Sequence, residues 1–137
     1  MASDRTEPVS IVVVDDAKFT LEMLRRVLET TGYTDIRSAG SAAEALAMLD
    51  DRQADILLAD WLMPEMDGLG LTREVREQDA GSDHRTSIIL LSGKDEAGAL
   101  TEAYASGVDH FVTKSPDSEG LLDAVRVAVE RIQGSRE

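Results

Sequence analysis

The stretch VSIVVVDDAKF, residues 9–19, decides the fold. Apart from Ser10, its first six residues are apolar and β-branched, which is typical of a strand buried on both faces of a parallel sheet. The run ends abruptly in two adjacent acids, Asp15 and Asp16. Taken alone, this pair predicts either a simple strand end that leads into a helix or a site for a cation, because two neighbouring carboxylates repel each other.

Four more short apolar runs follow at intervals that leave room for a helix between each pair. Strands that alternate with helices predict one α/β domain, with a parallel sheet and right-handed crossovers. The predicted strands span residues 9–14, 34–39, 55–60, 87–92 and 108–114.

The segments between the strands carry helix signals. An apolar stripe of Met23, Leu24, Val27 and Leu28 runs along the first helix, and Gly32 ends it. The sequence SAAE at 41–44 predicts a capping box, in which Ser41 and Glu44 satisfy backbone groups at the start of the second helix. Further helices are predicted at 69–78 and 95–106, and a last one, capped by Ser115 and opened by Pro116, runs to about residue 132.

Composition excludes several classes of protein. The 137 residues suit one domain, and the 42% hydrophobic and 30% charged residues suit a globular one. No cysteine is present, so disulfides and thiolate metal sites are excluded, and no apolar run approaches the roughly 20 residues of a membrane span. A net charge of −13 argues against direct binding of nucleic acid. The polar start lacks a signal peptide, so we expect a cytoplasmic domain over 9–132, with a flexible lead at 1–8 and a polar tail at 133–137.

Polar residues close the other predicted strands as well. Asp60 ends the third strand, Ser92 the fourth and Lys114 the fifth. Each alone is an ordinary strand end, turn or surface residue, but ligands of open α/β sheets bind at the carboxyl ends of the strands. In a sheet of order 2-1-3-4-5 the three aspartates would meet, and charges ~4 Å apart repel by about 4 kcal/mol unless a cation neutralises them.

Such a cluster predicts a metal-assisted phosphoryl site. Oxygen ligands that leave room for water suit Mg²⁺, with Mn²⁺ as an alternative ion. Aspartate can attack phosphorus as a nucleophile, and a cation with a lysine can neutralise the phosphoryl oxygens.

The sequences VVVDDAKF (12–19), ILLADWLMPEMDG (56–68), IILLSGKD (88–95) and HFVTK (110–114) resemble the receiver domain of two-component response regulators, the CheY-like superfamily. The resemblance covers residues 9–132. It implies a flavodoxin-like (βα)5 fold: five parallel strands in the order 2-1-3-4-5 with helices on both faces. It also implies a phosphorylation-dependent signalling switch and not a turnover enzyme.

The resemblance assigns roles to individual residues. Asp60 would be the phosphoacceptor, taking the group from the phosphohistidine of a histidine kinase or phosphotransfer protein. Asp16, Asp60 and the backbone carbonyl of Leu62 would bind Mg²⁺ directly, and Asp15 would act through a metal-bound water.

The resemblance also implies roles for residues around the acceptor. These further roles are three: Ser92 and Lys114 would contact the phosphoryl group, Ser92 and Phe111 would form the switch, and Leu62 and Lys94 would tune the phosphoryl lifetime. Moving such a switch from mostly inactive to mostly active takes ~5.5 kcal/mol of differential stabilisation. The family usually has proline after the lysine, whereas here Ser115 precedes Pro116, so a cis bond after Lys114 would lack proline's help.

The output is expected through protein contacts of the fourth helix, the fifth strand and the last helix. The target is a separate protein or an output domain outside this chain, and a homodimer stays open. Two alternatives remain: a degenerate receiver that binds constitutively, and a haloacid-dehalogenase-type phosphatase, which needs a second Asp where Leu62 stands.

Five other side chains receive lesser predictions. Trp61 follows the acceptor and would pack partly on its loop or report ligand binding by fluorescence. His84 and His110 are interpreted as surface residues without metal-site spacing. Phe19 and Leu21 are interpreted as core, semi-exposed or kinase-docking residues.

Overall fold

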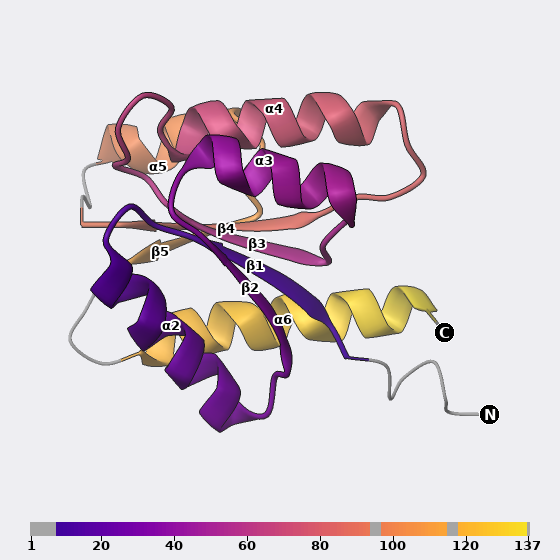
Figure 1. Ribbon diagram of the computed structural model, residues 1–137. Helices are drawn as coiled ribbons and strands as arrows, with labels where there is room; N and C mark the ends of the chain where they lie inside the picture. The colour runs from indigo at the N-terminus through magenta and orange to yellow at the C-terminus, as the bar shows by residue number, and fades with distance from the viewer. Residues whose placement is uncertain (1–7, 94–96, 115–117, 137) are drawn as a thin grey trace.

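The computed structural model describes residues 8–93, 97–114 and 118–136 (Figure 1). Strands and helices alternate along the described part of the chain, as the sequence predicts. The strands are β1 (Ser10–Val14), β2 (Asp35–Ala39), β3 (Ile56–Asp60), β4 (Ser87–Ser92) and β5 (His110–Thr113). The helices are α2 (Lys18–Thr31), α3 (Ala42–Asp51), α4 (Gly68–Ala80), α5 (Ala97–Ala105) and α6 (Glu119–Arg136).

The five strands form one parallel sheet in the order β2-β1-β3-β4-β5, which confirms the predicted flavodoxin-like topology. Helices α2 and α6 cover one face of the sheet, and α3, α4 and α5 cover the other (Figure 1). Strands β1 and β3 are neighbours, with Val14 opposite Ala59, so the residues that follow this pair, Asp15 and Asp60, reach the same edge. The carboxyl ends of all five strands therefore meet at one edge of the sheet.

The core consists of two apolar layers, one on each face of the sheet. Val12 and Val14 point into the layer under α3, α4 and α5, whereas Ile11 and Val13 point into the layer under α2 and α6. All four side chains are at most 1% exposed, which explains why residues 11–14 are all apolar. Burying each contributes about 1.5–3 kcal/mol.

Two helices differ from the sequence prediction. In α2, Met23 was expected in the buried stripe but is 49% exposed, and Leu28 is the buried residue of this helix. Helix α2 contacts the neighbouring strands β1 and β2, so only a narrow stripe of it is covered. Helix α6 continues to Arg136, beyond the predicted end near residue 132, because residues 133–136 contain no proline that would stop it.

The helix caps are partly those predicted. Ser41 accepts a hydrogen bond from the Glu44 N–H at 3.1 Å, as in a capping box, but the Glu44 carboxylate accepts from the Gly40 N–H and not from Ser41. Asp67 caps α4 by accepting from the Gly70 N–H at 2.8 Å. The predicted cap of Ser115 and Pro116 lies outside the described residues.

Among the residues that the structure describes, no helix combines the length and the apolar character that crossing a membrane requires.

Candidate functional site

Three aspartates meet at the carboxyl edge of the sheet. Asp15 follows β1, Asp16 comes next, and Asp60 is the last residue of β3. Each offers a carboxylate oxygen within 4.8 Å of those of the other two. Asp15 is 2% exposed and Asp60 7% exposed, whereas Asp16 faces solvent. The predicted cluster therefore exists, with two acids buried in the wall of the site and one at its rim.

The Asp15 carboxylate is incompletely satisfied. Its Oδ1 accepts a hydrogen bond from the Ala17 N–H at 2.8 Å, but its buried Oδ2 has no hydrogen-bond partner among the described residues. Burial raises the pKa of this carboxyl above its ordinary value, and the negative charge of Asp60 raises it further. The hydrogen bond from Ala17 lowers the pKa but does not cancel the rise. A buried, unpaired carboxylate oxygen beside two other acids fits a hard cation with oxygen ligands.

Lys114 brings the positive charge of the site. Its Nζ lies 2.9 Å from Asp60 Oδ1, and its side chain is 43% exposed. The Lys114 N–H donates to the Ser92 carbonyl at 2.7 Å, which ties the end of β5 to the end of β4. Ser92 is buried, at 1% exposure. Ser92 and Lys114, the polar residues predicted to end β4 and β5, therefore lie at the same edge of the sheet as the three aspartates.

Both backbone polar groups of Trp61, the residue after Asp60, form hydrogen bonds. The Trp61 N–H donates to the Leu91 carbonyl at 2.9 Å, and its carbonyl accepts from the Gly68 N–H at 2.8 Å. Trp61 is 5% exposed, so it is a core residue and packs more deeply than predicted. Leu62, by contrast, is 60% exposed beside the acceptor segment.

Phe111 lies apart from the acid cluster. It is half-buried in β5 and packs against the layer that contains Trp61. The two rings meet edge to face, with centroids 6.0 Å apart and planes at 83°. The sequence predicted a switch position for Phe111 but not this contact.

Gly68 is a second feature that sequence reasoning missed, since Asp67-Gly68 was interpreted only as a turn. A Cβ at Gly68 would lie 2.6 Å from the Asp60 carbonyl oxygen and 2.6 Å from Leu90 Cδ1. Only glycine lets α4 begin this close to the acceptor strand.

Several predicted features lie elsewhere. Lys94 and the Lys114–Ser115 bond fall outside the described residues. His84 and His110, interpreted as surface residues, are half-buried and line a pocket near the opposite edge of the sheet. The His84 ring nitrogen Nε2 lies 2.7 Å from the Ala54 carbonyl oxygen, because the loop before β4 folds back onto the residues that lead into β3.

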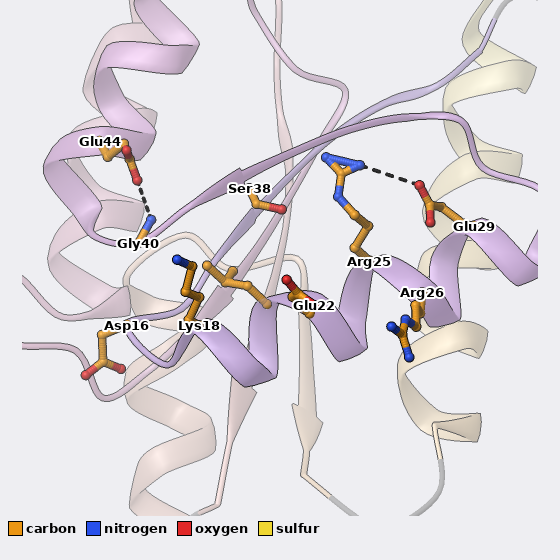
Figure 2. A pocket seen from close by; sticks show the side chains of 10 residues that line it. Asp16, Lys18, Glu22, Arg25, Arg26, Glu29, Ser38, Gly40 and Glu44 are labelled. Carbon is orange, nitrogen blue, oxygen red and sulfur yellow. Dashed lines mark hydrogen bonds and ion pairs between the residues drawn. The ribbon is translucent and has the colours of Figure 1, made fainter.

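A groove of about 740 Å³ opens beside Asp16, between α2 and the end of β2 (Figure 2). Its side chains mix both signs of charge, and Arg25 pairs with Glu29 at 3.5 Å along its wall. The lining residues with charged side chains are Asp16, Lys18, Glu22, Arg25, Arg26, Glu29 and Glu44. The groove extends the polar surface of the site away from Lys114.

Comparison with known proteins agrees with this geometry. The family model of the response regulator receiver domain matches residues 11–126. The response regulator MprA of Mycobacterium ulcerans is 34% identical over 123 residues, which cover 90% of this chain and 51% of MprA. The chemotaxis protein CheY of Bacillus subtilis is 28% identical over 115 residues, or 84% of this chain and 92% of that protein.

Among solved structures, a CheX-CheY-BeF3-Mg complex from Borrelia burgdorferi has a chain that superposes with a TM-score of 0.81 at 25% identity, covering 90% of this chain and 91% of that one. The chain spans about half the length of MprA, so the match concerns one domain of such relatives. The receiver match also sets aside the haloacid-dehalogenase alternative. The topology, the edge of acids closed by a lysine and the family model together show that this chain belongs to the response regulator receiver domain family.

Proposed function

We propose that this domain is a phosphorylation-driven switch in which Asp60 is the phosphoacceptor. One observation carries the proposal: Asp60 is the residue that the acid cluster and the lysine share, within 4.8 Å of the oxygens of Asp15 and Asp16 and 2.9 Å from Lys114 Nζ. A nucleophilic carboxylate between a cation site and a fixed ammonium group suits attack on a charged phosphoryl group.

The transfer is a substitution at phosphorus. A carboxylate oxygen of Asp60 bonds to the phosphorus of a phosphohistidine, the P–N bond breaks, and the imidazole of the donor leaves with the electron pair. The product is an acyl phosphate on Asp60. Lys114 lies within hydrogen-bond distance of Asp60 and would form an ion pair with the phosphoryl oxygens of the product. The Ser92 hydroxyl is at the end of the neighbouring strand β4.

Mg²⁺ is the proposed cofactor. Asp16, Asp60 and the Leu62 carbonyl would hold it directly, and the unpaired Asp15 oxygen would bind one of its waters. When bound, the ion supplies positive charge that neutralises the acid cluster and the transferred group. The superposed CheY from Borrelia burgdorferi was solved with BeF3 and Mg, which supports this choice of ion.

The proposed partner for phosphorylation is a histidine kinase or phosphotransfer protein. Phe19, 76% exposed, and Met23, 49% exposed, lie on α2. Met23 lines a cavity of about 260 Å³ that also reaches Lys114 and Leu121. This apolar face beside the reacting lysine suits a helical donor domain. Leu21, also considered for docking, instead packs against the core layer under α2 and α6.

The output surface is proposed on α5, β5 and α6. Ser92 precedes α5 and Phe111 lies in β5, so a change at either residue reaches this side. Leu100 and Tyr104 are 46% and 48% exposed on α5, and they offer an apolar face to a target protein, an output domain or a second copy of the chain.

The test uses Mg²⁺ and acetyl phosphate, with the intact mass of the protein as the readout. We expect one added phosphoryl group that requires Mg²⁺ and is lost in Asp60→Asn. Asp83→Asn is the matched control, because Asp83 is an exposed aspartate near the opposite edge of the sheet. No uptake by the wild-type protein would favour the degenerate receiver, and uptake by Asp60→Asn at the same rate would remove Asp60 from its role.

A further inference from the structure

Trp61 and Phe111 form a contact that spans three strands. Trp61 directly follows β3, Phe111 lies in β5, and β4 runs between the two strands. The edge-to-face geometry of the rings, with centroids 6.0 Å apart and planes at 83°, is a favoured arrangement for an aromatic pair. Phe111 is thus linked to the residue next to Asp60 without passing through Ser92.

The backbone of Trp61 has little freedom to move independently of Asp60. Its N–H is bonded to Leu91 in β4, and its carbonyl is bonded to Gly68 at the start of α4. The indole itself is 5% exposed and lies in the apolar layer of α3, α4 and α5. Phe111 is only half-buried, so its ring has more room to change position than the indole has.

We propose that Trp61 is a positioning residue of the switch: its indole holds the Phe111 ring in the position described here, and the state of Asp60 reaches Phe111 partly through this contact. The inference rests on the proposed function. A favourable edge-to-face pair shifts a two-state side-chain equilibrium by about two- to tenfold, so loss of the pair changes how often Phe111 leaves its position.

The first test needs neither metal nor phosphoryl group. The chain has two phenylalanines, and Phe19 is 76% exposed on α2, so protein labelled with 4-fluorophenylalanine gives one signal from Phe111 and one internal reference. Trp61→Leu is expected to move or broaden the Phe111 fluorine signal and leave that of Phe19 unchanged. Leu49→Ala is the control for general loosening, because Leu49 belongs to the same layer but lies in α3, against β1 and β2. An unchanged Phe111 signal in Trp61→Leu overturns the inference.

The second test is a double-mutant cycle on binding of beryllofluoride with Mg²⁺, measured by calorimetry. We expect Trp61→Leu to change the affinity about two- to tenfold, and Trp61→Phe, which keeps a ring, to restore most of it. In a Phe111→Leu background the Trp61→Leu change is expected to have no further effect.

The outcomes of this cycle separate the two proposals. If Trp61→Leu changes the affinity equally in both backgrounds, the indole acts on the acid site directly. This result overturns the inference about Trp61 and Phe111 but leaves the proposed function intact. Failure of the wild-type protein to bind the pair overturns the proposed function and this inference with it.

Discussion

Asp15 is a carboxylate whose two oxygens have different surroundings. One accepts a backbone hydrogen bond from Ala17, and the other is buried and has no hydrogen-bond partner within residues 8–93, 97–114 and 118–136. Leaving a buried acceptor unsatisfied costs about 1–3 kcal/mol, which a bound cation would offset. The sequence predicted that Asp15 and Asp60 would meet, because parallel neighbouring strands bring their ends together. It could not predict the Trp61–Phe111 contact, because that depends on side-chain depth and rotamers across an intervening strand.

Leu62 offers a test of phosphoryl lifetime at the residue scale. Its 60% exposed apolar side chain has no group that can hydrogen-bond a water attacking the acyl phosphate on Asp60. We expect Leu62→Asn to shorten the phosphoryl half-life several-fold, measured by the decay of phosphorylated protein after donor removal. Leu100→Asn, a similar change on the exposed face of α5, should leave the half-life unchanged. Equal half-lives for Leu62→Asn and wild type would remove this role for Leu62.

Gly68 tests how tightly the acceptor segment is packed. A methyl group there would lie 2.6 Å from the Asp60 carbonyl oxygen and 3.0 Å from Trp61 Cα, so backbone has to shift. Gly68→Ala should lower the free energy of unfolding by about 1–3 kcal/mol and slow phosphorylation. In Gly98→Ala nothing lies within 4 Å of the new methyl group, and a helix gains from alanine, so stability should hold or rise. Urea denaturation compares the two, and equal effects would contradict the packing argument.

At the scale of elements, Arg76 joins α4 to the strands beside it. Its guanidinium lies 2.9 Å from Asp79 Oδ2 and 2.6 Å from Asp109 Oδ2, and it also donates to the carbonyls of Thr86 and Gly107. The three charged side chains are only 14–18% exposed. This network fixes α4 at the edge of the sheet opposite the acid cluster.

Removing the guanidinium takes an ion pair from Asp79 and one of two from Asp109, which keeps the exposed Arg85 at 2.8 Å. We expect Arg76→Met to lower the free energy of unfolding by roughly 3 kcal/mol, seen as a lower urea midpoint. Arg126→Met is the matched control, because Arg126 forms its ion pairs on the exposed side of α6 and should change stability little. If both variants had the same midpoint, the network at Arg76 would be no stronger than surface pairing.

His110, at the start of β5, gives the protein a pH dependence. Burial lowers the pKa of this imidazole below its ordinary value, and the nearby charge of Arg131 lowers it further, against a smaller effect of Asp109. The unfolded chain therefore binds the proton at higher pH than the folded one, so stability falls as pH drops below about 6.5.

His110→Gln should make the loss of stability between about pH 7.5 and about pH 5.5 smaller, measured by urea midpoints at both pH values. Arg131→Gln should also reduce the loss, because it removes the charge that disfavours protonation of His110. An unchanged loss in His110→Gln would mean that other groups cause the pH dependence.

Element boundaries were less predictable than element types. The period and length of the apolar runs gave every strand and helix in the correct order. Local interactions decide where each helix begins and ends. The Glu44 carboxylate accepts from the Gly40 N–H, Asp67 caps α4, and α6 continues to Arg136. These interactions involve single hydrogen bonds of about 1 kcal/mol, too little to leave a strong pattern in the sequence.

For the whole molecule, topology does most to create the site. One sheet order brings the ends of β1, β3, β4 and β5 to one edge, so residues separated by up to 99 positions, from Asp15 to Lys114, share one site. The net charge of −13 adds a general preference for cations over polyanions. The fold and the acid cluster were therefore predictable from the sequence, whereas the aromatic contact and the polar groove beside Asp16 required coordinates.

We expect the phosphoryl group to transfer to Asp60 and to no other residue. The most direct measurement reduces the phosphorylated protein with borohydride, which converts a phosphorylated aspartate to homoserine, and maps that residue by peptide mass spectrometry. Homoserine is expected at position 60 alone, formed only when Mg²⁺ was present. Homoserine at position 15 or 16, or modification spread over several acids, would contradict this expectation.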